Sequence, residues 1–235
     1  MNELVPEQER VHKVFENISK DYDKMNTVIS FNQHKSWRND MMEQMNVQEN
    51  AAVLDVCCGT ADWTVALAEE VGPKGQVIGL DFSESMLEAA TDKVAPYEQV
   101  ELVQGDAMNL PFPDNSFDYV TIGFGLRNIR DYRQALREMH RVLKPGGMFA
   151  SLETSQPESP MFRVAFRLYF KYIMPLCGAI LSKHYKEYSW LEQSAKEFPG
   201  KKQLAKELRA IGFEDIFFKG YTGSVAAGHI GFKAE

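Results

Sequence analysis

Acidic residues follow several apolar runs of the sequence, at places where they could bind a nucleoside. Asp55 lies within one such run, and Gly59 follows in a predicted tight turn that lets the backbone approach a ligand closely. Asp81 ends the next run, about twenty residues beyond the turn, where a carboxylate can accept hydrogen bonds from both ribose hydroxyls. Asp106 and Ala107 follow a third run. There a carboxylate could accept from an adenine amino group while a backbone amide meets a ring nitrogen.

The same residues have structural alternatives. A glycine is common in any turn between a strand and a helix, and an acid after a strand can cap the next helix. The spacing and order of Gly59 and Asp81 favour the nucleoside interpretation. The G-x-G-x-x-G fingerprint of dinucleotide-binding proteins is not present, because the glycines it requires do not follow Gly59.

Ionisable and aromatic residues also precede the first apolar run. Tyr22, Asp23 and His34 belong to a segment in which such residues alternate without a regular period, so we expect a loop that closes over the site. His34 taken alone is more often a surface or capping residue.

A fourth apolar run ends at Gly123, and Arg127 and Asn128 follow it. In an open α/β sheet, ligands bind beyond the carboxyl ends of the strands. We therefore expect this segment to face the reacting end of a bound cofactor.

The elements that must position these residues alternate between strands and helices, a pattern that predicts a parallel sheet with right-handed crossovers. The predicted strands are residues 53–56, 76–81, 100–104, 117–122 and 148–153, and the predicted helices include 62–70, 132–142 and 201–211. The KPGG sequence at 144–147 stops the second of these helices, and residues 213–218 and 225–232 form a closing hairpin. The sequence thus predicts a Rossmann-like α/β fold with a seven-stranded sheet whose last strand is antiparallel.

The length of 235 residues suits one domain with additions. Its expected parts are an N-terminal helical cap (1–48), a cofactor-binding core (49–153), a lid or substrate insertion (154–200), and a last helix with the closing hairpin (201–235). Within the insertion, Arg163, Arg167 and Lys171 recur four residues apart among aromatic residues and would share one stripe of a helix. Two interpretations stay open: a helix packed on the domain with solvated charges, or an interfacial helix that meets a lipid-like substrate and anionic headgroups.

Composition excludes several classes. The formal net charge of −7 argues against a nucleic-acid-binding protein. Three cysteines, two of them adjacent, make neither a metal-binding spacing nor a disulfide framework, which fits a reducing compartment. The charged N-terminal segment is not a signal peptide, and no run of 18 or more apolar residues occurs. We expect a cytoplasmic protein without a metal.

Longer segments carry a resemblance to known proteins. The turn around Gly59 resembles the D-x-x-x-G-T loop of class I methyltransferases that use S-adenosylmethionine, which cradles the methionine end of that cofactor. YDKMN at 22–26, followed by Ser30, His34 and Trp37, resembles the N-terminal signature of the ubiquinone/menaquinone-biosynthesis C-methyltransferases. Their second signature is similar to RVLKPGG at 141–147 followed by LETS at 152–155, and GFGLRN at 123–128 also looks like theirs. The similarity extends along essentially the whole chain.

This resemblance implies methyl transfer from S-adenosylmethionine to a ring carbon of a prenylated benzenoid or naphthoid ring, the last carbon added in making menaquinone. It implies that Thr60, Asp81, Asp106 and Ala107 contact the cofactor, and the expected cofactor site also includes Asp55, Gly59 and Gly123. Some members that serve both quinones have serine where Gly123 stands. That difference, the short chain and the lack of a transit peptide favour a prenylated naphthoquinol as the substrate. We also expect a peripheral membrane contact and leave a homodimer open.

The reaction places demands on the site. Transfer from a sulfonium is an in-line displacement, so near-attack geometry supplies much of the rate enhancement. An aromatic carbon becomes a good nucleophile only when a ring hydroxyl is deprotonated, so we expect the reduced hydroquinone as the substrate. Tyr22, Asp23 and His34 are the candidates for proton handling, and Arg127 and Asn128 for stabilising the oxygen. Each could instead be structural, with Arg127 and Asp23 pairing with one another.

Two other functional classes stay open. One is a methyltransferase for a different small molecule, such as a sterol-like or hydroxybenzoate substrate. The other is a non-catalytic protein that binds the cofactor and scaffolds a quinone-synthesising assembly. The cofactor motifs argue against the second class, because a scaffold would not need Asp81 and Asp106.

Overall fold

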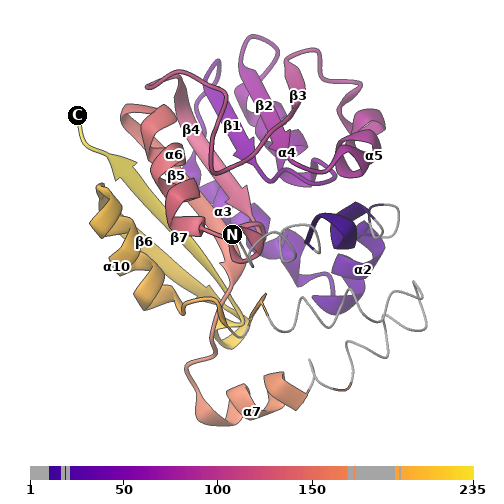
Figure 1. Cartoon of the computed structure of the whole chain (residues 1–235), viewed down its shortest axis with the longest axis vertical. Helices are drawn as coiled ribbons and strands as arrows, with labels where there is room; N and C mark the ends of the chain where they lie inside the picture. Colours follow the sequence, from indigo (N-terminus) through magenta and orange to yellow (C-terminus); the bar gives the residue numbers. More distant parts are fainter. Residues whose placement is uncertain (1–10, 17–18, 20–21, 169–171, 173–193, 196) are drawn as a thin grey trace, which may run out of the picture.

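The computed structural model describes residues 11–16, 19, 22–168, 172, 194–195 and 197–235. They build a seven-stranded sheet in the order β3-β2-β1-β4-β5-β7-β6 (Figure 1). Its strands are β1 (Ala52–Val56), β2 (Gln76–Asp81), β3 (Val100–Gln104), β4 (Phe117–Gly123), β5 (Leu143–Thr154), β6 (Phe213–Tyr221) and β7 (Ala226–Lys233). The first five strands of this order, from β3 across β2, β1 and β4 to β5, pair in parallel. Strand β7 runs antiparallel to both of its neighbours, β5 and β6. The predicted fold class is confirmed.

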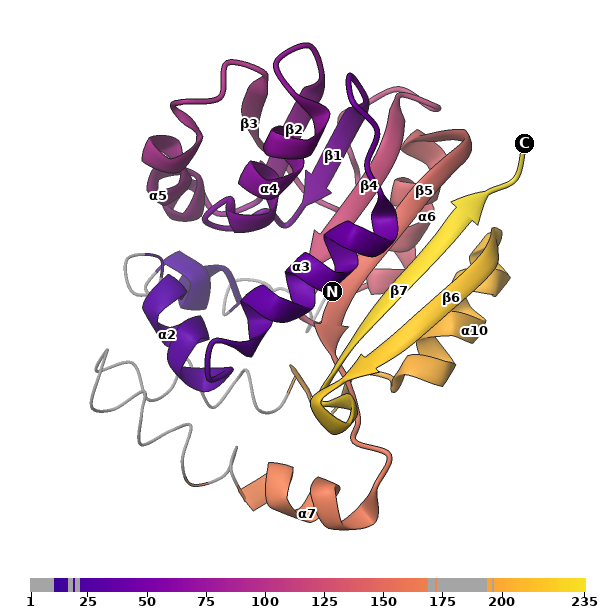
Figure 2. The same cartoon turned by 180° about the vertical axis from the view of Figure 1, so that it is seen from behind.

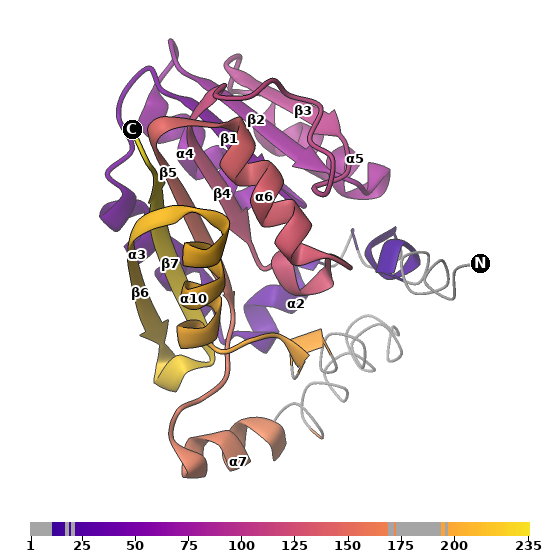
Figure 3. The same ribbon diagram turned by 60° about the vertical axis from the view of Figure 1, so that its left-hand side comes forward.

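Helices cover both faces of the sheet, which is why most residues of its central strands are apolar and buried. Helices α3 (Gln33–Met45), α4 (Asp62–Val71) and α5 (Glu84–Val94) lie on one face (Figure 2), and α6 (Tyr132–Val142) and α10 (Lys201–Ile211) lie on the other (Figure 3). In β1, Val53, Leu54 and Val56 are fully buried, as expected of a strand packed on both sides. Leu136 and Leu208 fill one of the two cores, and Met41 and Leu67 fill the other.

The strand order reverses between β1 and β4. From β1 the chain adds β2 and β3 on one side, and β4 and β5 follow on the other. The crevice beyond the carboxyl ends of such strands is where open α/β sheets bind ligands. Gly59 follows β1 and Gly123 ends β4, so this topology brings the two glycines to the same place.

Two predicted boundaries differ from the structure. Residues 144–147 belong to β5, because Leu143 already pairs with Phe117 before the register shifts to Tyr119 and Met148. Helix α6 still ends at Val142, as predicted. The closing hairpin exists, but its first strand extends to Tyr221 and its second begins and ends one residue later than predicted.

The N-terminal segment differs more. Residues 11–16 are helical, and Tyr22–Ile29 forms helix α2, so the prediction of a loop there is wrong. Met25 supplies the buried contact of α2 and is 2% exposed. A turn through Phe31 and Asn32, both with positive φ, joins α2 to α3.

Most of the predicted insertion at 154–200 lies outside the described residues. Its first part forms helix α7 (Pro160–Leu168), on which Arg163 donates to the carbonyl of Pro157. The predicted cationic stripe cannot be followed further, because Lys171 and the side chain of Arg167 are not described. Of the helices that are described, none combines the length and apolarity needed to cross a membrane.

Candidate active site

Two cavities meet at the carboxyl ends of β1 and β4. The larger has a volume of about 460 Å³ and extends over the ends of β2 and β3. The smaller, of about 60 Å³, lies between the glycine turn and helices α2 and α3. Both cavities are lined by Tyr22, Cys57, Gly59, Gly123 and Phe124, which we call the junction.

The turn after β1 is built for close approach of a ligand. Gly59 has a φ of 55°, and a Cβ added there would meet a single side chain, that of Tyr22, at 3.8 Å. Cys57 and Ala61 also have positive φ, an uncommon conformation for residues with a side chain. Such conformations cluster at ligand-binding sites, where the surrounding structure maintains them. The turn therefore has the backbone conformation and the open space that a ligand-binding site requires.

Asp81 lies at the end of β2 on the wall of the larger cavity. Its two oxygens accept from the backbone N–H groups of Gly59 and Ser83, at 2.9 and 3.0 Å. Burial raises the pKa of the carboxyl, although these hydrogen bonds oppose the shift. Each carboxylate oxygen accepts more than one hydrogen bond, so Asp81 can hold the glycine turn and a ribose together.

Asp106 and Ala107 line the same cavity beyond β3. Asp106 is exposed and accepts from the N–H of Met108 at 2.8 Å, which forms a local turn. Ala107 is buried in the core below. A helix at 11–16 closes the other side of this cavity, where Phe15 packs with Met86.

Asp55 lines the smaller cavity but is 1% exposed. Its carboxylate accepts from the hydroxyls of Thr64 at 2.7 Å and Thr121 at 2.8 Å. Burial raises the pKa of Asp55 to about 6. These contacts tie β1 to α4 and β4, so Asp55 holds the strands on either side of the junction in place.

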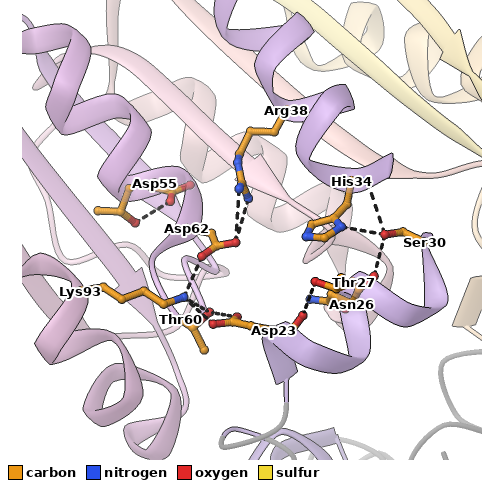
Figure 4. A network of polar contacts seen from close by, with 11 residues as sticks. Asp23, Asn26, Thr27, Ser30, His34, Arg38, Asp55, Thr60, Asp62 and Lys93 are labelled. Atoms are coloured by element: carbon orange, nitrogen blue, oxygen red, sulfur yellow. Dashed lines mark hydrogen bonds and ion pairs between the residues drawn. The ribbon is translucent and has the colours of Figure 1, made fainter. Parts of the chain in front are cut away.

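A network of charges closes the smaller cavity (Figure 4). Asp23 accepts from the hydroxyl of Thr60 at 2.6 Å and from the ammonium of Lys93 at 2.5 Å. Lys93 also donates to Asp62 at 2.7 Å, and Arg38 donates to the other oxygen of Asp62 at 3.2 and 3.3 Å. Burial alone lowers the pKa of Lys93, but the bonds to both carboxylates outweigh it and raise the pKa. The network joins α2 to the glycine turn and to α4 and α5.

His34 faces the same cavity from α3. It is 7% exposed, so the prediction of a surface residue is wrong. Its Nδ1 lies 2.7 Å from the hydroxyl of Ser30. Burial, with a smaller effect of the Arg38 charge, lowers the pKa of His34, so the imidazole is neutral near pH 7.

Tyr22 borders both cavities and packs edge-on against Phe15. Burial raises the pKa of its phenol. The group therefore stays protonated near neutral pH and can donate a hydrogen bond, but it is a poor base.

Arg127 does not pair with Asp23; that alternative is wrong. Its Nη1 donates to Glu153 and to the carbonyl of Phe124, each at 2.6 Å, and Arg127 lines neither cavity. Asn128 lines the larger cavity and donates through Nδ2 to the same carbonyl at 3.3 Å. Its Oδ1 is buried and, within the described part of the chain, has no hydrogen-bond partner.

Gly123 lies against the ring of Trp63. A Cβ at this position would come within 2.9 Å of Trp63 Cε3, closer than the ring allows without a shift. The ring of Trp63 therefore occupies the space that a serine side chain at position 123 would need.

All seven predicted cofactor residues thus line one or both cavities, and so do four of the five predicted catalytic residues; Arg127 is the exception. Sequence reasoning missed Arg38, Asp62, Lys93 and Glu153 as parts of the site. Lys93 is an ordinary last-turn lysine of α5 in the sequence, and nothing local indicates its partners. Among the described residues, no three His, Cys, Asp or Glu side chains are grouped to hold a metal ion.

Known proteins are similar to this chain in sequence and in fold. The model of the ubiE/COQ5 methyltransferase family matches residues 3–233. A demethylmenaquinone methyltransferase of Lysinibacillus sphaericus (strain C3-41) is 62% identical over 225 residues, which cover 96% of each chain. One from Geobacillus stearothermophilus is 60% identical over 228 residues, covering 96% of this chain and 97% of that one. A crystal structure of an S-adenosylmethionine-dependent methyltransferase from Aquifex aeolicus shares the fold, with a TM-score of 0.61 at 20% identity over 83% of this chain and 88% of that one. The chain therefore belongs to the ubiE/COQ5 methyltransferase family.

Proposed function

We propose that this protein transfers a methyl group from S-adenosylmethionine to a ring carbon of demethylmenaquinol, giving menaquinol in the last step of menaquinone biosynthesis. The observation that carries the proposal is the junction of the two cavities. It lies where the glycine turn, β4 and α2 meet, with the predicted cofactor residues on its walls. The identity of about three residues in five to proteins called demethylmenaquinone methyltransferases supports the choice of substrate.

The residues present fit the cofactor. Asp81 and Asp106 line a cavity large enough for an adenosine. Gly59, one of the junction residues, has no side chain that would block a ligand there. When bound, S-adenosylmethionine supplies an electrophilic methyl group on a sulfonium that joins its adenosine to its amino-acid end. With the adenosine in the larger cavity and the amino-acid end in the smaller one, the sulfonium belongs at the junction.

The protein's own groups then prepare the ring carbon. The hydroquinol must lose a hydroxyl proton to become a strong carbon nucleophile, and the ring proton must leave after transfer. His34 is neutral and able to accept a proton, whereas the Asp23 carboxylate is engaged by Thr60 and Lys93. Tyr22 keeps its proton and can donate to a ring oxygen, and Asn128 Oδ1 can accept from a ring hydroxyl. Arg127 acts through Phe124, whose φ of 55° is unusual for a bulky residue and whose carbonyl Arg127 binds.

The proposal is tested with purified protein, methyl-labelled S-adenosylmethionine and a short-tailed demethylmenaquinone. We expect methylated product when dithionite or borohydride keeps the quinone reduced, and none with the oxidised quinone. His34→Gln should lower kcat by about 100-fold or more, the usual loss for a general base. Equal turnover of reduced and oxidised substrate would contradict the mechanism, and methylation of a hydroxybenzoate instead would contradict the substrate.

The protein meets its prenylated substrate at the membrane surface, since each buried methylene of the tail favours the bilayer by about 0.8 kcal/mol. Helix α7 supports this part of the proposal because Phe162, Val164 and Leu168 are large apolar side chains exposed on one helix.

Replacing both Val164 and Leu168 by Glu should abolish binding to anionic vesicles. It should also lower activity on a long-tailed substrate while sparing a short-tailed one. Phe217→Glu, at an equally exposed site on β6, is the control. Unchanged vesicle binding by the double variant would show that α7 is not the contact.

A further inference from the structure

The smaller cavity must receive a group that carries both a positive and a negative charge. The amino-acid end of the proposed cofactor has an ammonium and a carboxylate, and a buried carboxylate requires a cation or several N–H donors. The carboxylates lining this cavity, Asp23, Asp55 and Asp62, would repel it. A cation on the same wall would offset this repulsion and pair with the ligand carboxylate.

Arg38 is that cation. Among the described residues that line the smaller cavity, it is the one lysine or arginine. It follows His34 by one helical turn on α3, so both side chains lie on the same face of the helix (Figure 4). Its side chain is 17% exposed, which weakens the competition from water for its donors.

The geometry leaves Arg38 able to bind a ligand. A guanidinium has five N–H donors in a planar fork suited to carboxylates. The hydrogen bonds to Asp62 use Nη1 and Nη2 and converge on a single oxygen, Oδ2. Lys93 holds the other oxygen of Asp62, so the charge of that carboxylate is compensated from both sides.

We infer that Arg38 binds the carboxylate of the amino-acid end of S-adenosylmethionine, with Asp62 and Lys93 as positioning residues that fix the guanidinium. The inference rests on the proposed function, because it takes this cofactor as given. It makes Arg38 a determinant of cofactor specificity: the site distinguishes ligands that carry the carboxylate from those that lack it.

Calorimetry with three ligands tests the inference. S-Adenosylhomocysteine has the complete amino-acid end, its decarboxylated analogue lacks the carboxylate alone, and 5′-methylthioadenosine lacks the whole amino-acid end. Arg38→Met should weaken S-adenosylhomocysteine binding by about 10- to 100-fold, the usual loss for a charge-assisted pair. It should change the affinities for the other two ligands less than about threefold, which is under 1 kcal/mol. Lys35→Met, an exposed cation on the same helix, is the matched control and should change none of the three.

Other outcomes decide against the inference. Equal losses for all three ligands would mean that Arg38 supports the fold of the cavity, and an unchanged affinity for S-adenosylhomocysteine would mean that another group holds the carboxylate. If Arg38→Met does not fold, Arg38→Lys keeps the charge but loses the fork, and it should still show a loss confined to S-adenosylhomocysteine. Wild-type protein that bound none of the three ligands would refute the proposed function itself, a result distinct from failure of the Arg38 assignment.

Discussion

The guanidinium of Arg127 lies 2.6 Å from the carboxylate of Glu153, and the two side chains are only 10% and 2% exposed. The backbone N–H of Arg127 also donates to Glu153, at 3.3 Å. The end of β5 is thereby joined to the segment after β4 that contains Phe124, a residue of the junction. The pair therefore maintains the shape of the site.

Removing one partner of this pair should be costly. Glu153→Gln leaves the buried Arg127 charge uncompensated, and we expect the free energy of unfolding to fall by about 3 kcal/mol or more, as measured by urea denaturation. Glu158→Gln removes the ion pairs of an exposed carboxylate with Lys201 and Lys202 and should lower the free energy of unfolding far less. Equal costs for the two variants would show that burial does not strengthen the Arg127 pair.

Asp81→Ala should weaken the binding of S-adenosylhomocysteine. The variant loses the proposed ribose acceptor and the carboxylate that holds the N–H groups of Gly59 and Ser83, so we expect a loss of about 1.5–3 kcal/mol by calorimetry. Asp92→Ala, an exposed aspartate on α5, is the control and should bind as the wild type does. An unchanged affinity in a folded Asp81 variant would remove Asp81 from the site.

Gly123→Ser should be tolerated only if Trp63 gives way. The added Cβ falls 2.9 Å from the Trp63 ring, and overpacking of this kind costs about 1–3 kcal/mol. In a Trp63→Leu background the same substitution should cost less than half as much, because the conflicting ring is gone. The free energies of unfolding of the wild type, the two single variants and the double variant are compared by urea denaturation. A cost that is the same in both backgrounds would place the strain elsewhere.

Asp55 should make stability depend on pH. Burial raises its pKa from 3.8 to about 6, so between these values the folded state binds more protons than the unfolded state. Stability from this group is therefore present at low pH and falls as the pH rises through that window, by roughly 3 kcal/mol in total. Asp55→Asn cannot titrate there.

The difference in the free energy of unfolding, wild type minus Asp55→Asn, should accordingly decline between pH 4 and pH 6.5 and be constant above about pH 7. A wild-type minus Asp55→Asn difference independent of pH would mean that folding does not shift the pKa of Asp55.

The sequence by itself determined the sheet and the edge of it at which the predicted cofactor residues gather. A strand buried on both faces must be largely apolar, and β2, buried at every residue after Gln76, has the predicted bounds. The edge strand β3 is only partly buried and also has the predicted bounds. Helix α6 also matches, since its apolar residues recur with the helical period. Asp81 could be assigned because a parallel sheet brings the carboxyl ends of its strands to one edge, whatever the details of packing.

Only the tertiary structure decided which polar groups meet. Asp23 pairs with Lys93 and Arg127 with Glu153, partners that are 70 and 26 residues away in the sequence. Charge pairing leaves no periodic signal in the sequence, because it depends on which side chains the fold brings within a few ångströms. Helix α2 was missed for a related reason. Tyr22 packs at the glycine turn and Met25 packs into the core, and the two do not form a regular apolar face. Its stability comes from contacts that exist only once the sheet has formed.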